Sequence, residues 1–207
     1  MKSATKASVA VLVLLSIACS ATSGASANAQ ATTTRTPTPV DGQVLDPKLR
    51  GAATKAFLAR IGQYVSFHNN VAKMVPAFSQ TPDPALLTKR QAALAEAIIK
   101  QRPDAKEGDF LIKQYQPYLR QIISEDFTRR PAADRKALIV ELPKDVAIGV
   151  NMVYPTTLPL ATFPGNLLKL LPELPPDLEY RIVGRHLILR DVEANVIVDL
   201  MRDVFPV

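Results

Sequence analysis

The sequence contains few of the residues on which reactive and ring-stacking sites depend. Among 207 residues there are no tryptophans, one cysteine and two histidines, and aromatic residues make up 6% of the chain. This shortage of flat rings argues against a carbohydrate platform or a base-stacking surface. A transition-metal site needs several imidazole or thiolate ligands, which this chain scarcely supplies. The eight glycines are spread singly along the sequence, so it has no glycine-rich phosphate loop.

The single cysteine, Cys19, lies in a segment typical of an export signal. Lys2 and Lys6 precede the apolar run Ala7–Ala18, which is too short to span a membrane as a stable helix. Two processing routes fit this segment: ordinary signal cleavage after Ala29, or lipoprotein processing that leaves the chain anchored through Cys19. On either route we expect an exported protein, periplasmic or secreted, whose mature domain forms no disulfide.

Composition divides the chain into five segments. Residues 30–45 are mostly small, polar or proline, so they cannot bury enough apolar surface to become ordered. The expected segments are a signal peptide at 1–29 (1–18 for a lipoprotein), a disordered linker at 30–45, a helical bundle at 46–142, a proline-rich strap at 143–177, and a β-hairpin or meander at 178–207 packed on the bundle.

Apolar residues at helical spacing predict three long amphipathic helices and a shorter fourth. Asp46 is a predicted N-cap for the first, and Pro47 suits the first helical position because it has no N–H to donate. Asp83 and Pro84 open the second helix in the same way. The third follows the sequence EGDF, and Pro117 either bends it or marks its true start. Short connections between long helices indicate antiparallel neighbours and hence a small bundle.

The stretch LEYRIVGRHLILRDVEANVIVD, at 178–199, alternates around a tight turn. The pair Gly184–Arg185 suits a two-residue β-hairpin, which would place Glu179 opposite Arg190. Asn195 can close a second turn in the left-handed conformation, so a third strand follows. We therefore predict an α+β fold, in which an antiparallel bundle of three to four helices packs against a small C-terminal antiparallel β-meander.

Three motifs, GDF before a helix, VNMVYP, and LPELPPDLEYRIVGRHLILRDVEANVIVD, resemble a family of exported bacterial proteins with no assigned activity. The resemblance covers most of the mature domain and is sharpest from Pro172 to Asp199. The hairpin is also similar to small periplasmic modules of the nickel- and cobalt-homeostasis type. What the resemblance implies concerns location and fold, and it supplies no catalytic residue.

Each candidate site residue has a structural alternative. His68 lies on the apolar stripe of the first helix, either as a base or metal ligand or as a buried histidine hydrogen-bonded to a neighbour. We favour the buried histidine, because no second histidine or cysteine is near it in sequence. Asp191 is expected to accept hydrogen bonds from backbone amides of its own turn. Tyr180, Tyr154 and His68 are the candidates for a ligand pocket between bundle and meander, and we expect no catalytic residue, metal or cofactor.

The sequence favours a non-catalytic exported accessory protein of the cell envelope, or a secreted one, that binds a macromolecule or has a structural role. The first alternative is a periplasmic small-ligand or metal-binding module, and the second is a hydrolase whose catalytic groups the sequence does not reveal. Export argues against a nucleic-acid partner. The formal charge of +6 and the basic cluster at 129–136 allow weak contact with anionic lipid or wall polymer. A solvated helix end explains the cluster more simply.

Overall fold

The computed structural model describes residues 46–77, 82–139, 147–158 and 163–206. The chain divides into two units after Gly42, and every described residue belongs to the second, Gln43–Val207. The expected signal peptide, Cys19 and the linker at 30–45 lie outside the described residues, as does part of the expected strap. Among the helices that are described, none is both long and apolar enough to cross a membrane.

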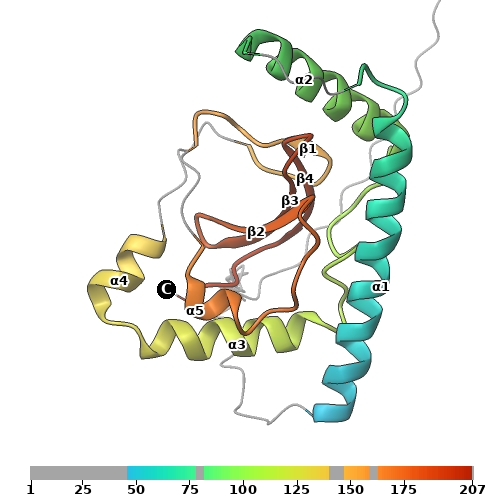
Figure 1. Cartoon of the computed structure of the whole chain (residues 1–207). Coiled ribbons are helices and arrows are strands. Elements are labelled where there is room, and N and C mark those ends of the chain that lie inside the picture. The colour runs from blue at the N-terminus through green and yellow to red at the C-terminus, as the bar shows by residue number, and fades with distance from the viewer. Residues whose placement is uncertain (1–45, 78–81, 140–146, 159–162, 207) are drawn as a thin grey trace, which may run out of the picture. The chain divides into compact units, whose positions relative to one another are not determined.

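The fold is α+β, as predicted, with helices in the N-terminal part and an antiparallel sheet in the C-terminal part (Figure 1). In chain order the described elements are α1 (Pro47–Ala72), α2 (Pro84–Gln101), α3 (Gln116–Arg129), α4 (Ala132–Leu138), β1 (Met152–Val153), α5 (Gly165–Leu168), β2 (Leu178–Val183), β3 (His186–Asp191) and β4 (Val196–Met201).

The helix starts follow the predicted capping chemistry. The Asp46 side chain accepts a hydrogen bond from the Lys48 amide at 2.8 Å, and α1 begins at Pro47. Asp83 caps α2 in the same way, because its carboxylate accepts from the Ala85 amide at 2.9 Å. Pro117 marks the start of α3 and does not bend it, since α3 begins one residue earlier.

The sheet has the strand order β1-β4-β3-β2, which leaves β2 at one edge. The β2–β3 hairpin has the predicted register, with Val183 opposite His186 and Glu179 opposite Arg190. Asn195 adopts a φ of 56° at the turn into β4, as expected for a left-handed turn residue. The strap supplies a fourth strand, β1, which pairs antiparallel with β4.

The hairpin turn depends on Gly184, whose φ is +56°. We expect Gly184→Ala to destabilise the domain by about 1 kcal/mol, because a Cβ is strained in the left-handed region. Gly62 is a matched control, since it lies within α1 and a Cβ there would meet nothing within 4 Å. Gly62→Ala should stabilise the domain by about 0.5–1 kcal/mol. Urea unfolding of both variants checks the prediction, which fails if the two changes have the same sign.

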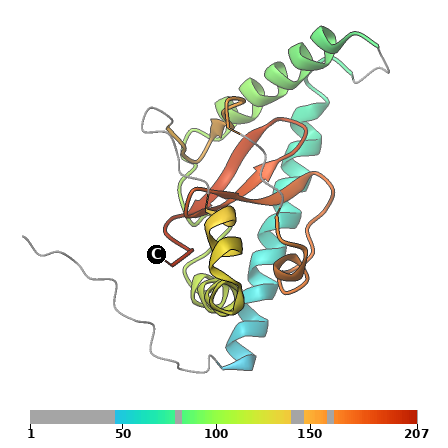
Figure 2. The same cartoon turned by 90° about the vertical axis from the view of Figure 1, so that its left-hand side faces the viewer.

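Both faces of the sheet are covered. On one face the side chains of β2, β3 and β4 pack against α1, α3 and α5, and Figures 1 and 2 show α1 passing along this side of the sheet. On the other face Ile188, Ile197 and Leu200 pack with Tyr154 and Leu158 of the strap. The helix α2 covers the turn between β3 and β4. The buried apolar residues there form a separate cluster: Val71, Leu94, Ala95, Ile98, Ala194 and Val196.

Candidate functional site

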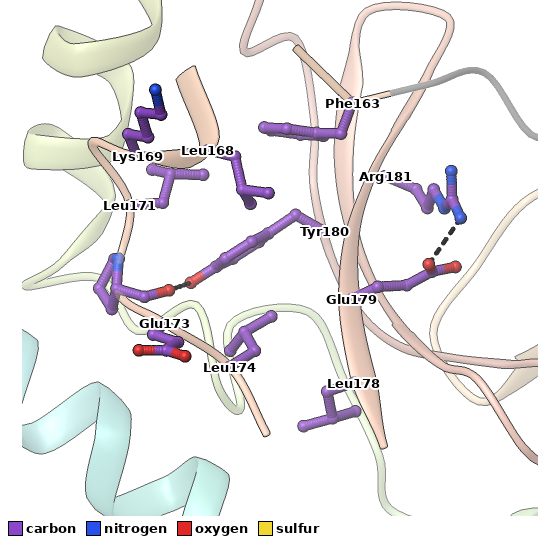
Figure 3. Close-up of a pocket in the computed structure, with 11 residues that line it drawn as sticks. Phe163, Leu168, Lys169, Leu171, Glu173, Leu174, Leu178, Glu179, Tyr180 and Arg181 are labelled. Carbon is purple, nitrogen blue, oxygen red and sulfur yellow. Dashed lines mark hydrogen bonds and ion pairs between the residues drawn. The ribbon is translucent and has the colours of Figure 1, made fainter. Parts of the chain in front are cut away.

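A pocket of about 620 Å³ lies beside edge strand β2, between that strand and the segment around α5 (Figure 3). Its volume is within the range of small-molecule sites, which are concave and mostly apolar. Seven apolar or aromatic residues form its walls: Phe163, Leu168, Leu171, Pro172, Leu174, Leu178 and Tyr180. Five of them, all but Leu178 and Tyr180, come from the predicted strap, so the strap builds most of this site.

The ring of Tyr180 lies at the centre of the pocket, with the leucine side chains around it (Figure 3). Its hydroxyl donates a hydrogen bond to the main-chain oxygen of Pro172 at 3.2 Å, which fixes the ring against the strap. The ring centroid of Phe163 is 6.1 Å away. Burial raises the pKa of Tyr180 well above its ordinary value, so the phenol is neutral and serves as wall and donor.

Four charged residues line the same pocket: Lys169, Glu173, Glu179 and Arg181. Glu179 is engaged by two guanidinium groups, those of Arg181 and Arg190. Burial acts to raise the pKa of Glu179, but the hydrogen bonds from the two arginines outweigh it and hold that pKa below the usual value. Lys169 and Glu173 are exposed and stand at the mouth of the pocket.

The pocket adjoins the edge of the sheet at β2. Leu178 and Tyr180 belong to one face of β2 and Glu179 and Arg181 to the other, yet all four line the pocket. In a two-residue hairpin the residues next to the turn form a hydrogen-bonded pair, so alternate residues of β2 direct their main-chain groups away from β3. Tyr180 is one of these residues. A bound molecule would therefore meet apolar side chains together with a main-chain N–H and C=O.

His68 lies elsewhere, in a buried polar cluster that joins α1 to the turn between β3 and β4. Its side chain is 1% exposed. Its Nδ1 lies 2.7 Å from Oδ2 of Asp191, and its Nε2 lies 3.1 Å from Oε2 of Glu193. The hydroxyl of Tyr64 donates to the same Asp191 oxygen at 2.7 Å. The second oxygen of Asp191 accepts from the Ala194 amide at 2.8 Å, which is the turn role predicted for this residue.

The electrostatics of this cluster make His68 a structural cation. The hydrogen bond to Asp191 raises the pKa of His68 to about 9, although burial opposes the rise. Arg90 contacts Glu193, so two cations face two carboxylates. Both ring nitrogens point at carboxylate oxygens, so neither is available to take a proton from a substrate. His68 is thus the buried, hydrogen-bonded histidine that the sequence favoured.

The three candidate pocket residues are not brought together. Tyr180 lines the pocket beside β2. Tyr154 packs against the opposite face of the sheet, where the guanidinium of Arg190 lies 5.6 Å from its ring centroid. His68, which belongs to α1, is enclosed in the polar cluster with Asp191 and Glu193. Sequence reasoning did not identify Phe163 or the strap leucines as pocket walls, and the only signal was apolar residues within a proline-rich segment.

No known protein family matches the chain, and neither a curated protein nor a solved structure is significantly similar to it. Within the described residues, no group of three or more histidine, aspartate and glutamate side chains is arranged to hold a metal ion. The pocket beside β2 is therefore the candidate functional site of the described residues.

Proposed function

We propose that this protein is a non-catalytic binding protein for a small, mostly apolar molecule with a polar group at one end. The observation that carries the proposal is the pocket of about 620 Å³, which is lined by seven apolar or aromatic residues and four charged ones. Apolar walls with few polar groups are typical of sites that bind by burying apolar surface and orient the ligand by its polar end. The predicted export would place this activity in the cell envelope or outside the cell.

The arrangement of the walls favours an extended chain over a bulky ring system. The Tyr180 ring extends across the pocket, and its hydroxyl is hydrogen-bonded to Pro172. A ligand would therefore lie along the face of this ring, beside the strap leucines (Figure 3). The main-chain groups of Tyr180 and the charged side chains of Lys169 and Glu173 offer donors and acceptors near the opening. A medium-length alkyl chain with a small polar head meets both requirements.

Calorimetric titration with decanoate and 1-decanol tests the proposal. We expect both to bind with a Kd on the order of 10–100 µM, because about a dozen non-hydrogen atoms would be buried against apolar walls. Leu174→Trp should weaken binding of both ligands at least about tenfold by filling the pocket. Leu174 is partly buried and lines the pocket, so the larger ring can occupy the pocket without entering the core.

Leu87→Trp is the matched control, because Leu87 lies on α2, outside the lining of the pocket, and is 39% exposed. It should leave both affinities unchanged. No heat of binding from either ligand, or equal binding by the wild type and Leu174→Trp, would contradict the proposal. Unfolding curves of the variants exclude loss of the fold as the cause.

A further inference from the structure

Three leucines stand on the surface around the strap segment that follows α5. Leu168 is 47% exposed, Leu170 is 49% exposed, and Leu58 of α1 is 40% exposed. A second pocket, of about 600 Å³, lies between α1 and the strap and is lined by Leu58 and Leu170. Leu171 and Pro172 line both pockets, so the two hollows adjoin. We call Leu58, Leu168, Leu170 and the second pocket the leucine surface.

Positive charge accompanies the leucine surface. Arg50 and Lys55 line the second pocket, and the described lining of that pocket contains no acidic residue. Lys169 lies between Leu168 and Leu170 in the chain and is exposed. Lysine and arginine have long apolar stems that can lie along such a surface while their charged ends reach an anion. Exposed leucines with Arg50, Lys55 and Lys169 beside them favour an anionic, partly apolar partner, although the exposed Glu173 lines the adjoining pocket.

We propose that the leucine surface docks on an anionic lipid bilayer. The leucines would enter the boundary between headgroups and acyl chains, and Arg50, Lys55 and Lys169 would pair with lipid phosphates. Binding of this kind scales with the buried apolar area and with the attraction of basic residues to anionic lipid. The charge complementarity of the second pocket, with two cations and no acidic lining residue, selects this occupant over a neutral apolar one.

This docking goes beyond the proposed ligand binding and does not depend on it. Arg50, Lys55, Leu58 and Leu170 line the second pocket and take no part in the walls of the pocket beside β2. Leu168 belongs to both regions, so a docked domain would bring the mouth of the ligand pocket against the bilayer. An amphiphile could then pass between membrane and pocket without crossing water.

Flotation of the full chain with lipid vesicles tests the docking. One vesicle set contains phosphatidylglycerol and phosphatidylcholine, and a second contains phosphatidylcholine alone. We expect the double variant Leu170→Asp with Lys55→Glu to lose at least about tenfold of its partitioning to the anionic vesicles. Partitioning to the neutral vesicles reports any contribution of the apolar run at 7–18, which is common to every variant.

A matched double variant on α2 controls for added negative charge. Leu86 is 52% exposed and Lys89 is exposed, and neither lines the leucine surface. Leu86→Asp with Lys89→Glu changes the charge equally and should keep the wild-type partitioning. Equal loss in the two double variants, or no preference of the wild type for anionic vesicles, overturns the docking proposal.

Two further readouts distinguish bilayer docking from ligand binding and from dimer formation. Leu174→Trp should still partition to anionic vesicles while its binding of decanoate is lost, so failure of the ligand proposal leaves the docking result intact. Light scattering gives the mass of the chain in solution. If Leu170→Asp with Lys55→Glu converts a dimer into a monomer and leaves vesicle binding unchanged, the surface joins two copies and the bilayer proposal is wrong.

Discussion

Replacement of Asp191 by alanine is expected to destabilise the domain by about 3–5 kcal/mol, because it removes one partner of a buried ion pair. Asp191 is fully buried and accepts hydrogen bonds from His68, Tyr64 and the Ala194 amide. Without the carboxylate, an imidazolium and a phenol hydroxyl remain in the interior with too few acceptors. Since domains of this size have unfolding free energies of about 5–15 kcal/mol, the loss would be a large share of the total. Urea unfolding followed by circular dichroism measures it.

Two variants show whether charge or shape causes the loss. Asp191→Asn keeps the size and one acceptor oxygen, so it should cost about 2–3 kcal/mol, less than alanine. Glu125→Ala removes a carboxylate from an exposed pair with Arg129, whose side chains are 51% and 72% exposed, and should cost less than about 0.5 kcal/mol. If Asp191→Ala costs no more than Glu125→Ala, the cluster does not hold α1 to the sheet.

Features set by neighbours in the chain were predictable from the sequence. A capping aspartate such as Asp46 contacts an amide only two residues away, so the identity of adjacent residues is sufficient. The hairpin register follows from the two-residue turn at Gly184–Arg185, because that turn leaves a single pairing for the flanking strands. The α+β fold follows from these elements, since amphipathic helices and an alternating sheet must bury their apolar sides together.

Contacts between distant residues were not predictable in the same way. Asp199 of β4 is buried and accepts hydrogen bonds from the Gly108, Phe110 and Leu111 amides. These amides are about ninety residues away in sequence, and no local pattern selects one aspartate among several as their acceptor. Burial acts to raise the pKa of Asp199, and the backbone hydrogen bonds oppose that rise. The sequence showed that His68 lies on an apolar stripe, but its carboxylate partners follow from tertiary packing alone.

The pocket shows the same limit. The sequence predicted a proline-rich strap at 143–177, and Tyr180 was a candidate pocket residue. Which strap leucines face Tyr180 depends on how α5 and Pro172 pack against β2, and prolines suppress the periodicity that would reveal it. Tyr154, chosen for the same pocket, follows β1, the strand at the opposite edge of the sheet from β2.

The stability of the domain should fall as the pH rises from about 6.5 to about 9. The folded-state pKa of His68 is about 9 against an ordinary value of 6.5, and the hydrogen bond to Asp191 is the first cause. A raised folded pKa means that the stabilisation is complete below pH 6.5, where both states are protonated. As the pH rises between the two pKa values, the unfolded chain releases its proton while the folded chain retains it, so the stabilisation is lost progressively. The difference between the two pKa values corresponds to about 3 kcal/mol in the free energy of unfolding.

His68→Gln supplies the control for this slope. The glutamine variant should be much less stable than the wild type at pH 6 and close to it at pH 9, since most of the stabilisation linked to the His68 proton is lost by that pH. Burial lowers the pKa of His186 below its ordinary value of 6.5, and burial raises that of Tyr64 above its ordinary value of 10.0, so neither of these two groups accounts for a slope in this range. Urea unfolding at half-unit steps of pH measures the slope. A wild-type slope that persists in His68→Gln would mean that a group other than His68 causes it.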